Sequence, residues 1–334
     1  MTTVYVRERG AVIRKQGERL RVMSGDRELL HIPLADLTQL VLMGNVQLTT
    51  PSAIVLLRHD VDVVFMSYNG AYYGRLNPNT SKYADLRHKQ LRLCDDAARS
   101  LALARRIVIG KVTNQRVVLM RRADDLPEMT SAIQGMMAMY KAAEGARDLD
   151  QLRGFEGKAA AYHFAGLRLL VPAEWGFETR QYYPPPDPFN ALLSFVYTLL
   201  RKDVEANLQL TGLDAYLGFF HTLGYDRPAL ALDLMEEFRA AVGDLVVLNL
   251  VRGSAGGITL SDFRRTSQED APIRMSDSAA EKLVAAYEQR LEERAQIPGA
   301  NEQTSYRRII ELQARQIARI VRGEAQDYQP LLLR

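Results

Sequence analysis

One histidine stands ahead of a predicted helix that carries three acids in the stretch GFFHTLGYDRPALALDLMEEFR, residues 218–239. His221 stands a short loop ahead of a predicted helix. The early turns of that helix hold Asp233, Glu236 and Glu237. Imidazole nitrogens bind Mn²⁺ and related ions, and carboxylates suit Mg²⁺ and Mn²⁺, so the stretch has the donors of a divalent-metal site. Acids near a helix N-terminus are also favoured by the macrodipole, which leaves a purely structural acid cluster as the alternative.

Helix spacing does not choose between the two glutamates. Glu236 is three residues after Asp233, and Glu237 is four residues after it. Side chains at both spacings lie on the same face of an α-helix as the first residue. Either glutamate could therefore accompany His221 in a metal site.

A second candidate is Glu156, in LRGFEGKAAAYHFAGLRLL, residues 152–170. It lies between Gly154 and Gly157 in a run that otherwise favours helix. A glycine inside a helix costs about 1 kcal/mol relative to alanine, so two of them suggest that another helix or a phosphodiester approaches the backbone there. Tight helix packing beside a solvated Glu156 is the structural alternative. His163 follows seven residues later and is predicted to share the face of Glu156.

Basic residues are concentrated in RRIVIGKVTNQRVVLMRR, residues 105–122, which contains no acid. Lys and Arg neutralise backbone phosphates in nucleic-acid complexes. These residues do not form one stripe on a helix, so a solvated helix is the alternative, and neither Lys111 nor Arg116 is expected to belong to the metal site. Arg239, after the acids, could reach phosphate or pair with Glu236. The candidates for DNA contacts are Arg105, Lys111, Arg116 and Arg239.

Two kinds of segment must position these side chains. Up to residue 77 the chain reads mostly as short strands rich in β-branched and apolar residues, with one helix at TPSAIVLLRHD and a hairpin signal at Asn69-Gly70. Pro, Asn, Ser and Thr then mark a linker, after which nearly every segment has helix length, beginning with one over 85–122. The predicted fold class is α+β. Its parts are a small β-rich domain with one helix at residues 1–78, a linker at 79–88 and a larger all-helical domain at 89–334.

Composition excludes several classes of protein. The chain has 334 residues, 47% hydrophobic and 25% charged, with a formal net charge of +3, which is ordinary for a globular protein. The single Cys94 excludes an internal disulfide framework and fits a reducing compartment. Without a signal-peptide pattern or a membrane-length apolar run, we expect a soluble, cytoplasmic protein that does not contact membranes. No CxxC pair, GxxxxGKS or GxxxxGKT loop, or GxSxG elbow is present.

Several motifs together are similar to those of one family. RGFEGKAAAYHF is followed by PPPDPFNALLSFVYTLL and then by LGFFHTLGYDRPALALDLMEEFR, and GKVTNQRVVLMRR precedes all three. The N-terminal stretches GNVQLTTPSA and YYGRL match as well. In this order, over essentially the whole chain, they resemble the CRISPR-associated adaptation integrase, the universal spacer-acquisition nuclease of CRISPR systems.

The resemblance implies a single-metal site for Mg²⁺ or Mn²⁺ formed by Glu156, His221 and Glu236. It thereby favours Glu236 over Glu237, a choice that helix spacing left open. Asp233 is implied as a supporting or alternate ligand. The implied catalytic residues are Glu156, His221, Asp233 and Glu236.

The resemblance also implies a metal-dependent DNA endonuclease and integrase that inserts captured foreign DNA fragments into a CRISPR repeat array. The implied partners are double-stranded DNA, a second copy of the chain held through the N-terminal β domain, and a small ferredoxin-like adaptation protein. The helical domain is expected to hold the catalytic site. Two alternatives stay open: a stand-alone branched-DNA nuclease that uses the same site, and a non-catalytic helical nucleic-acid-binding scaffold whose acids only cap a helix.

Overall fold

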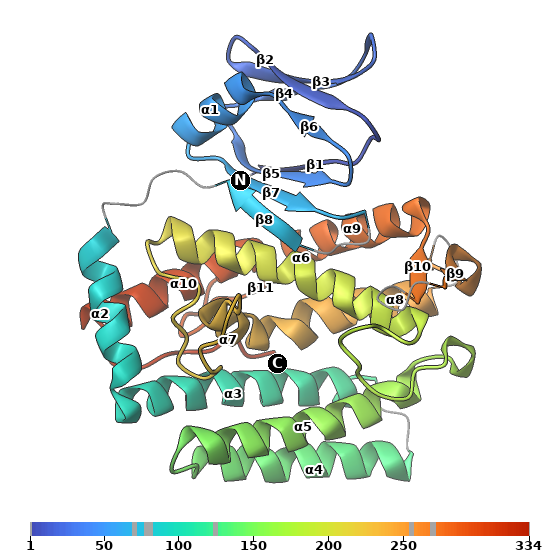
Figure 1. Ribbon diagram of the computed structural model, residues 1–334. Coiled ribbons are helices and arrows are strands. Elements are labelled where there is room, and N and C mark those ends of the chain that lie inside the picture. Colours follow the sequence, from blue (N-terminus) through green and yellow to red (C-terminus); the bar gives the residue numbers. More distant parts are fainter. Residues whose placement is uncertain are drawn as a thin grey trace. The chain divides into compact units, whose positions relative to one another are not determined.

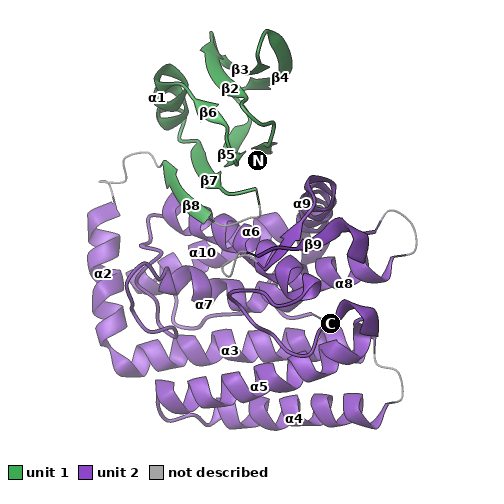
Figure 2. Ribbon diagram, turned by 45° about the vertical axis from the view of Figure 1, so that its right-hand side comes forward, with its two compact units in different colours: residues 1–81 green, residues 82–334 purple. Residues whose placement is uncertain are grey.

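The computed structural model describes residues 2–68, 72–76, 83–122, 126–253, 257–267 and 272–333. The chain divides into two compact units, Met1–Ser81 and Lys82–Arg334, coloured green and purple in Figure 2. The first unit is β-rich with one helix, and the second is largely helical. The predicted α+β class is therefore confirmed.

The N-terminal unit contains two four-stranded sheets among its described residues. The strands of the first sheet, in spatial order, are β1 (Thr2–Val6), β5 (Leu37–Met43), β7 (Asp62–Met66) and β8 (Tyr72–Leu76). Its first three strands run parallel, and β8 pairs antiparallel with β7. The strands of the second sheet are β4 (Arg27–Pro33), β3 (Arg19–Ser24), β2 (Val12–Gln16) and β6 (Gln47–Leu48). The hairpin signal Asn69-Gly70 lies outside the described residues.

The single helix of this unit, α1 (Thr50–Arg58), joins both sheets through one apolar cluster. Leu56 of the helix is fully buried in that cluster, together with Ile13 of β2 and Leu40 of β5. The hydroxyl groups of Thr49 and Ser52 each donate to the carbonyl oxygen of Ile13 at 3.1 Å. These bonds fix the start of α1 against β2.

The C-terminal unit consists mainly of helices. They are α2 (Ala84–Asp95), α3 (Ala97–Met120), α4 (Pro127–Glu144), α5 (Leu149–Leu170), α6 (Pro188–Leu210), α7 (Ala229–Phe238), α8 (Leu245–Arg252), α9 (Asp277–Glu292) and α10 (Tyr306–Arg322). A π-helical segment, Arg239–Asp244, connects α7 to α8. The smaller elements are 3-10 turns at Ala173–Trp175 and Leu260–Asp262, and the hairpins β9 (Phe263–Arg265) with β10 (Ile273–Met275) and β11 (Arg294–Gln296) with β12 (Gln303–Ser305).

Two predicted boundaries differ from the structure. The helix predicted over 85–122 is broken at Asp96, whose backbone is extended and whose side chain accepts a hydrogen bond from the backbone N–H of Arg99 at 3.0 Å. Asp96 thus caps α3, as an aspartate at this position commonly does. Residues 84–88, assigned to the linker, form the first turns of α2, and residues 79–82 lie outside the described part of the chain.

Helix α3 is an interior helix of this unit. It packs against α4, α5 and α7, and α3, α5 and α4 lie side by side in Figure 1. Its polar residues Lys111, Asn114 and Gln115 are buried along with its apolar ones. The interpretation of residues 105–122 as a solvated helix is therefore wrong. No helix within the described ranges has the length and apolar character needed to cross a membrane.

Candidate active site

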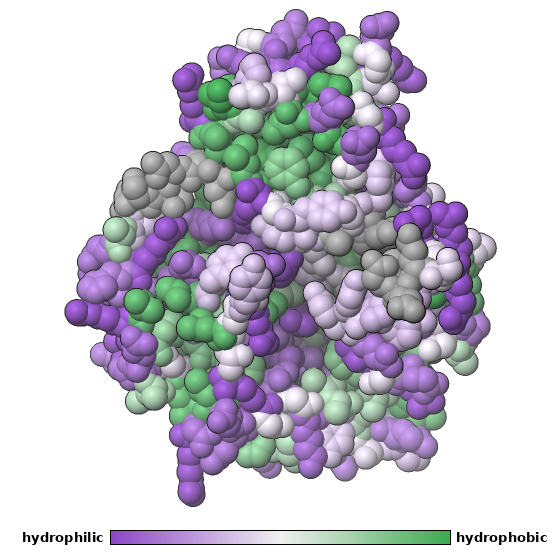
Figure 3. Space-filling view, in the orientation of Figure 1, coloured by the Kyte–Doolittle hydropathy of each residue, from purple (hydrophilic) through white to green (hydrophobic). Residues whose placement is uncertain are grey.

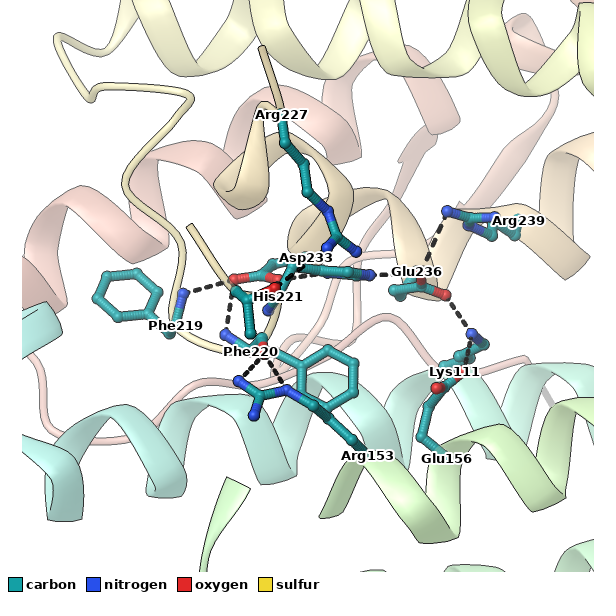
Figure 4. A network of polar contacts seen from close by, with 11 residues as sticks. Lys111, Arg153, Glu156, Phe219, Phe220, His221, Arg227, Asp233, Glu236 and Arg239 are labelled. Carbon is teal, nitrogen blue, oxygen red and sulfur yellow. Dashed lines mark hydrogen bonds and ion pairs between the residues drawn. The ribbon is translucent and has the colours of Figure 1, made fainter. Parts of the chain in front are cut away.

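Three helices and one loop bring the predicted site residues together in the C-terminal unit (Figure 4). Helix α3 contributes Lys111, α5 contributes Glu156, and α7 contributes Asp233 and Glu236. His221 comes from the loop that precedes α7. Sequence-distant segments thus form one charged centre.

Asp233 holds the loop that carries His221. Its carboxylate accepts backbone N–H groups from Phe219 at 2.6 Å, Phe220 at 3.0 Å and His221 at 2.9 Å. It also contacts the imidazole Nδ1 of His221 at 2.7 Å. Since this buried carboxylate is an acceptor, Nδ1 carries the proton and donates it, which leaves the lone pair on Nε2. Asp233 therefore fixes both the position and the tautomer of His221.

The same loop is tied to α5. The guanidinium of Arg153 donates to the carbonyl oxygen of Phe220 through Nε at 3.0 Å and through a terminal nitrogen at 2.8 Å. Arg153 stands three residues before Glu156 on this helix. The loop of His221 and the helix of Glu156 are thus held in one arrangement, as Figure 4 shows.

Glu236 lies buried among positively charged groups. Its Oε1 is 3.3 Å from a guanidinium nitrogen of Arg239 and 3.7 Å from Nε2 of His221. Its Oε2 is 2.5 Å from Nζ of Lys111, which makes an ion pair. The geometry of this contact is not that of a hydrogen bond, and Oε2 accepts no hydrogen bond from any described group. Burial opposes ionisation, but the positive charges of Arg239 and Lys111 outweigh it and lower the pKa of Glu236 to about 2. Glu236 is therefore ionised at neutral pH, as a metal ligand must be.

Glu237 faces a different environment. Its carboxylate accepts hydrogen bonds from Gln313 Nε2 at 3.0 Å, the Tyr328 hydroxyl at 2.6 Å and the backbone N–H of Leu331 at 2.5 Å. Burial raises the pKa of Glu237 to about 7, against the lowering effect of these three donors. The two adjacent glutamates thus have opposite pKa shifts. Glu236 faces the charged centre, whereas Glu237 holds the C-terminal tail.

Asn114 of α3 also holds the C-terminal tail through hydrogen bonds. Its side-chain nitrogen donates to the carbonyl oxygens of Glu237 at 2.8 Å and Leu331 at 2.9 Å. Its side-chain oxygen accepts the backbone N–H of Leu333 at 2.8 Å. The tail is therefore bonded to both α3 and α7.

Replacing Glu237 with Gln is expected to lower the free energy of unfolding by about 1–3 kcal/mol, because an amide nitrogen must then face one of the three donors. Cleavage and joining of DNA are expected to persist, since Glu237 does not face the charged centre. Urea denaturation at neutral pH measures the change. Glu324→Gln, at an exposed glutamate, serves as the control and should stay within about 0.5 kcal/mol of wild type. Equal stabilities of Glu237→Gln and wild type would contradict the role given to these bonds.

Lys111 occupies the space between the two predicted glutamate ligands. Its ammonium group contacts Oε1 of Glu156 as well as Oε2 of Glu236, and the residue is only 6% exposed. The expectation that Lys111 lies outside the site is therefore wrong, because α3 is interior and turns this side chain toward the carboxylates. Within the described ranges, no three His, Cys, Asp or Glu side chains are already arranged around a metal position.

The donors nevertheless fit a divalent ion. His221 presents an unprotonated Nε2, and the Glu236 oxygen Oε2 is buried without a hydrogen-bond donor. With Glu156, they offer one imidazole nitrogen and carboxylate oxygens, a donor set that suits Mn²⁺ and Mg²⁺.

The other basic candidates have different surroundings. Arg105 donates to the carbonyl oxygen of Ala146 at 2.6 Å and so ties α3 to the end of α4. Arg116 is half-buried, and its Nε has no hydrogen-bond partner in the described part of the chain. Arg239 pairs with Glu236, one of the two roles considered for it. DNA contacts by these arginines stay a prediction.

The two glycines of α5 lie on either side of Glu156 in the sequence, but about 160° and about 100° from it around the helix axis. Gly154 and Gly157 are exposed, and nothing described lies within 4 Å of where a Cβ atom would stand on either. Packing of another helix against these glycines is therefore not observed. Beside them, the side chain of Glu156 is 19% exposed. The backbone of α5 is therefore bare at these two positions, while the carboxylate of Glu156 projects from another face of the helix.

Arg239 contacts a buried set of residues, Tyr197, Asp244 and His163, whose contacts were not predicted from the sequence. The guanidinium lies over the ring of Tyr197, 4.9 Å from its centroid. The Tyr197 hydroxyl donates to Asp244, whose other oxygen is 2.8 Å from Nε2 of His163. Asp244 ends the π-helical segment that begins at Arg239, and such segments occur often at functional sites. His163, predicted to share the face of Glu156, is fully buried and supports this group.

Comparison with known proteins assigns this chain to a class, the CRISPR-associated proteins. A family model described as "CRISPR associated protein Cas1" matches residues 4–289. The CRISPR-associated endonuclease Cas1 3 of Thermus thermophilus is 38% identical over 334 residues, covering 99% of this chain and 97% of the relative. The chain belongs to the Cas1 family.

Solved structures agree with this assignment. A CAS1 protein from Thermotoga maritima superposes with a TM-score of 0.84 at 25% identity, covering 98% of this chain and 99% of that protein. A chain from a partial Cas6-RT-Cas1--Cas2 complex superposes with a TM-score of 0.68 at 25% identity, with 98% of each chain covered. Structures of this fold also include a complex with DNA.

Two predictions made from the resemblance are confirmed at the level of the family. The chain is a Cas1 protein, and its function is that of a Cas1 endonuclease and integrase in CRISPR spacer acquisition. The roles of individual residues and the identity of the metal stay predictions.

Proposed function

We propose that this chain joins the 3′ ends of a captured double-stranded DNA fragment to a CRISPR repeat, using Mg²⁺ or Mn²⁺ held by Glu156, His221 and Glu236. One observation carries the proposal: Asp233 holds Nδ1 of His221 at 2.7 Å, and Nε2 lies 3.7 Å from the ionised Glu236. A histidine fixed through one nitrogen by a carboxylate commonly binds metal through the other.

Glu156, His221 and Glu236 would hold the ion, which would supply Lewis acidity for in-line attack on the phosphodiester by a DNA 3′-hydroxyl or water. The side chains of the site orient the reacting phosphate around that position. Arg239 places a positive charge at the buried carboxylate of Glu236, where it would stabilise the charge that develops on the phosphate oxygens. Arg239 is held for this purpose by the Tyr197 ring.

The substrate approaches along α5 in this proposal. Gly154 and Gly157 leave its helix backbone uncovered, so a DNA backbone can come closer to α5 at these positions than over any residue with a side chain. Arg105 and Arg116 are proposed to contact further phosphates. Such contacts position the duplex without reading its sequence.

The assembly is proposed to contain two further kinds of partner. A small ferredoxin-like adaptation protein is supported by the solved relative that comes from a Cas1--Cas2 complex. A homodimer formed through the β-rich domain, residues 1–78, is supported by the edge strand β4, which exposes Leu29 and Leu30. Exposed apolar edge strands favour pairing with another chain. Figure 3 shows apolar side chains gathered on the face of this unit that is turned to the viewer.

The proposal is tested by incubating the protein with a short duplex bearing 3′-hydroxyl ends and a plasmid carrying a repeat array. We expect joined product with Mn²⁺ and the small partner, and none with a chelator or with fragments lacking the 3′-hydroxyl. Metal-dependent cleavage of branched DNA without joining would instead favour a stand-alone nuclease. DNA binding with neither reaction would favour a non-catalytic scaffold and contradict the proposal.

A further inference from the structure

Lys111 has two partners that the proposed metal also needs. Its ammonium group contacts Oε1 of Glu156 and lies 2.5 Å from Oε2 of Glu236. Both glutamates are proposed ligands, one from α5 and one from α7. The ammonium group is therefore the positive charge that balances the two carboxylates in this structure.

An ammonium group and a divalent ion cannot share this position. Close like charges in a buried site repel strongly, because the surroundings screen them poorly. Arg239 differs from Lys111, because it pairs with only one of the two proposed glutamate ligands, Glu236, and its guanidinium is fixed over Tyr197. Lys111, by contrast, ends in a point charge on a flexible four-carbon stem.

The displaced ammonium needs another anion. Lys111 is only 6% exposed, and a buried ammonium without a partner is strongly unfavourable. The anion that the proposed reaction brings to this place is the phosphodiester of DNA, and the side chain of Glu156, which contacts Lys111, is 19% exposed and so leaves the site open to it.

We infer that Lys111 competes with the divalent ion for Glu156 and Glu236 and, once displaced, binds a phosphate oxygen of the DNA at the reacting centre. This inference rests on the proposed function and adds a residue to it. Lys111 thereby links the two binding events: the metal releases the ammonium, and DNA phosphate receives it. Metal and DNA are expected to favour each other's binding.

The test is a Mn²⁺ titration followed by melting temperature, with wild type and Lys111→Met compared. The variant keeps the length of the side chain and removes its charge. Without metal we expect it to melt at a lower temperature, because two buried carboxylates lose their shared cation. Its apparent affinity for Mn²⁺ is expected to rise by about tenfold or more, as close charge pairs in buried sites couple strongly. At saturating Mn²⁺, DNA joining is expected to fall by about 10²-fold or more through loss of the phosphate contact.

Two further variants complete the experiment. Lys111→Gln, which keeps hydrogen-bond donors without the charge, should show the same rise in Mn²⁺ affinity and serves if Lys111→Met does not fold. Lys141→Met, at an exposed lysine on α4, is the control and should match wild type in both measurements.

The outcomes separate this inference from the proposed function. An unchanged or weaker Mn²⁺ affinity in both Lys111 variants would overturn the competition, since a merely structural lysine would support the site rather than oppose the ion. Normal joining at saturating Mn²⁺ would overturn the phosphate contact. If wild type binds Mn²⁺ but joins no DNA, the proposed function fails, while the titration still decides whether Lys111 competes.

Discussion

Replacing Glu236 with Gln is expected to reduce Mn²⁺-dependent joining and cleavage of DNA by about 10³-fold or more, to the background of the assay. The substitution removes the anion that Lys111 and Arg239 share and the carboxylate that faces Nε2 of His221. His221→Ala is expected to cause a similar loss, because it removes the only imidazole at the centre within the described residues. Rates are measured with a labelled duplex at saturating Mn²⁺.

The adjacent glutamate provides the matched control. Glu237→Gln makes the same chemical change one residue away and is expected to retain most of the activity. The reverse ranking of the two variants would assign the ligand role to Glu237. Wild-type rates in His221→Ala would contradict the proposed site altogether, and cooperative melting of each variant shows that a loss of rate is not a loss of fold.

Asp233→Asn is expected to reduce metal affinity or DNA joining by about 10–100-fold. The carboxylate accepts three backbone N–H groups and Nδ1 of His221, so an amide nitrogen in its place must face a donor. His221 then loses the acceptor that keeps the proton on Nδ1. Nitrogen NMR of the imidazole reports this tautomer directly, alongside the Mn²⁺ titration.

Asp262→Asn is a suitable control, because Asp262 also accepts a backbone N–H, that of Thr259 at 2.9 Å, in the separate 3-10 turn Leu260–Asp262. It is expected to leave the tautomer and the rates unchanged. Rates of Asp233→Asn within twofold of wild type, with an unchanged His221 tautomer, would mean that the loop is held by its backbone alone.

Features that depend on local spacing could be predicted from the sequence. The strand-rich start and the helical remainder follow from short-range periodicity, and the acids of α7 were recognisable as one cluster. The break between α2 and α3 also had a local signal, because aspartate commonly caps helices. Asp96 could therefore have been used to divide the helix predicted over 85–122.

Features that depend on long-range packing could not be predicted from the sequence. Lys111 meets Glu156, which is 45 residues away, and only the folded chain turns that side chain inward. Helix spacing treated Glu236 and Glu237 alike, because their difference arises from tail residues 91 and 94 positions further on. Tyr197 and Asp244 are likewise 47 residues apart, and their pairing depends on the π-helical segment, for which residue spacing gives no signal.

The hydrogen bonds that hold the C-terminal tail matter for any experiment that labels or tethers this protein. Leu331 is bonded to Glu237, next to Glu236, and to Asn114, one turn after Lys111. A pulling force applied near residue 333, or a bulky dye attached there, therefore strains α7 and α3, two of the helices that carry the charged centre. Surface attachment is better made through the N-terminal unit, which forms a separate compact body. A fluorophore placed on the tail would report on strain in α7 and α3.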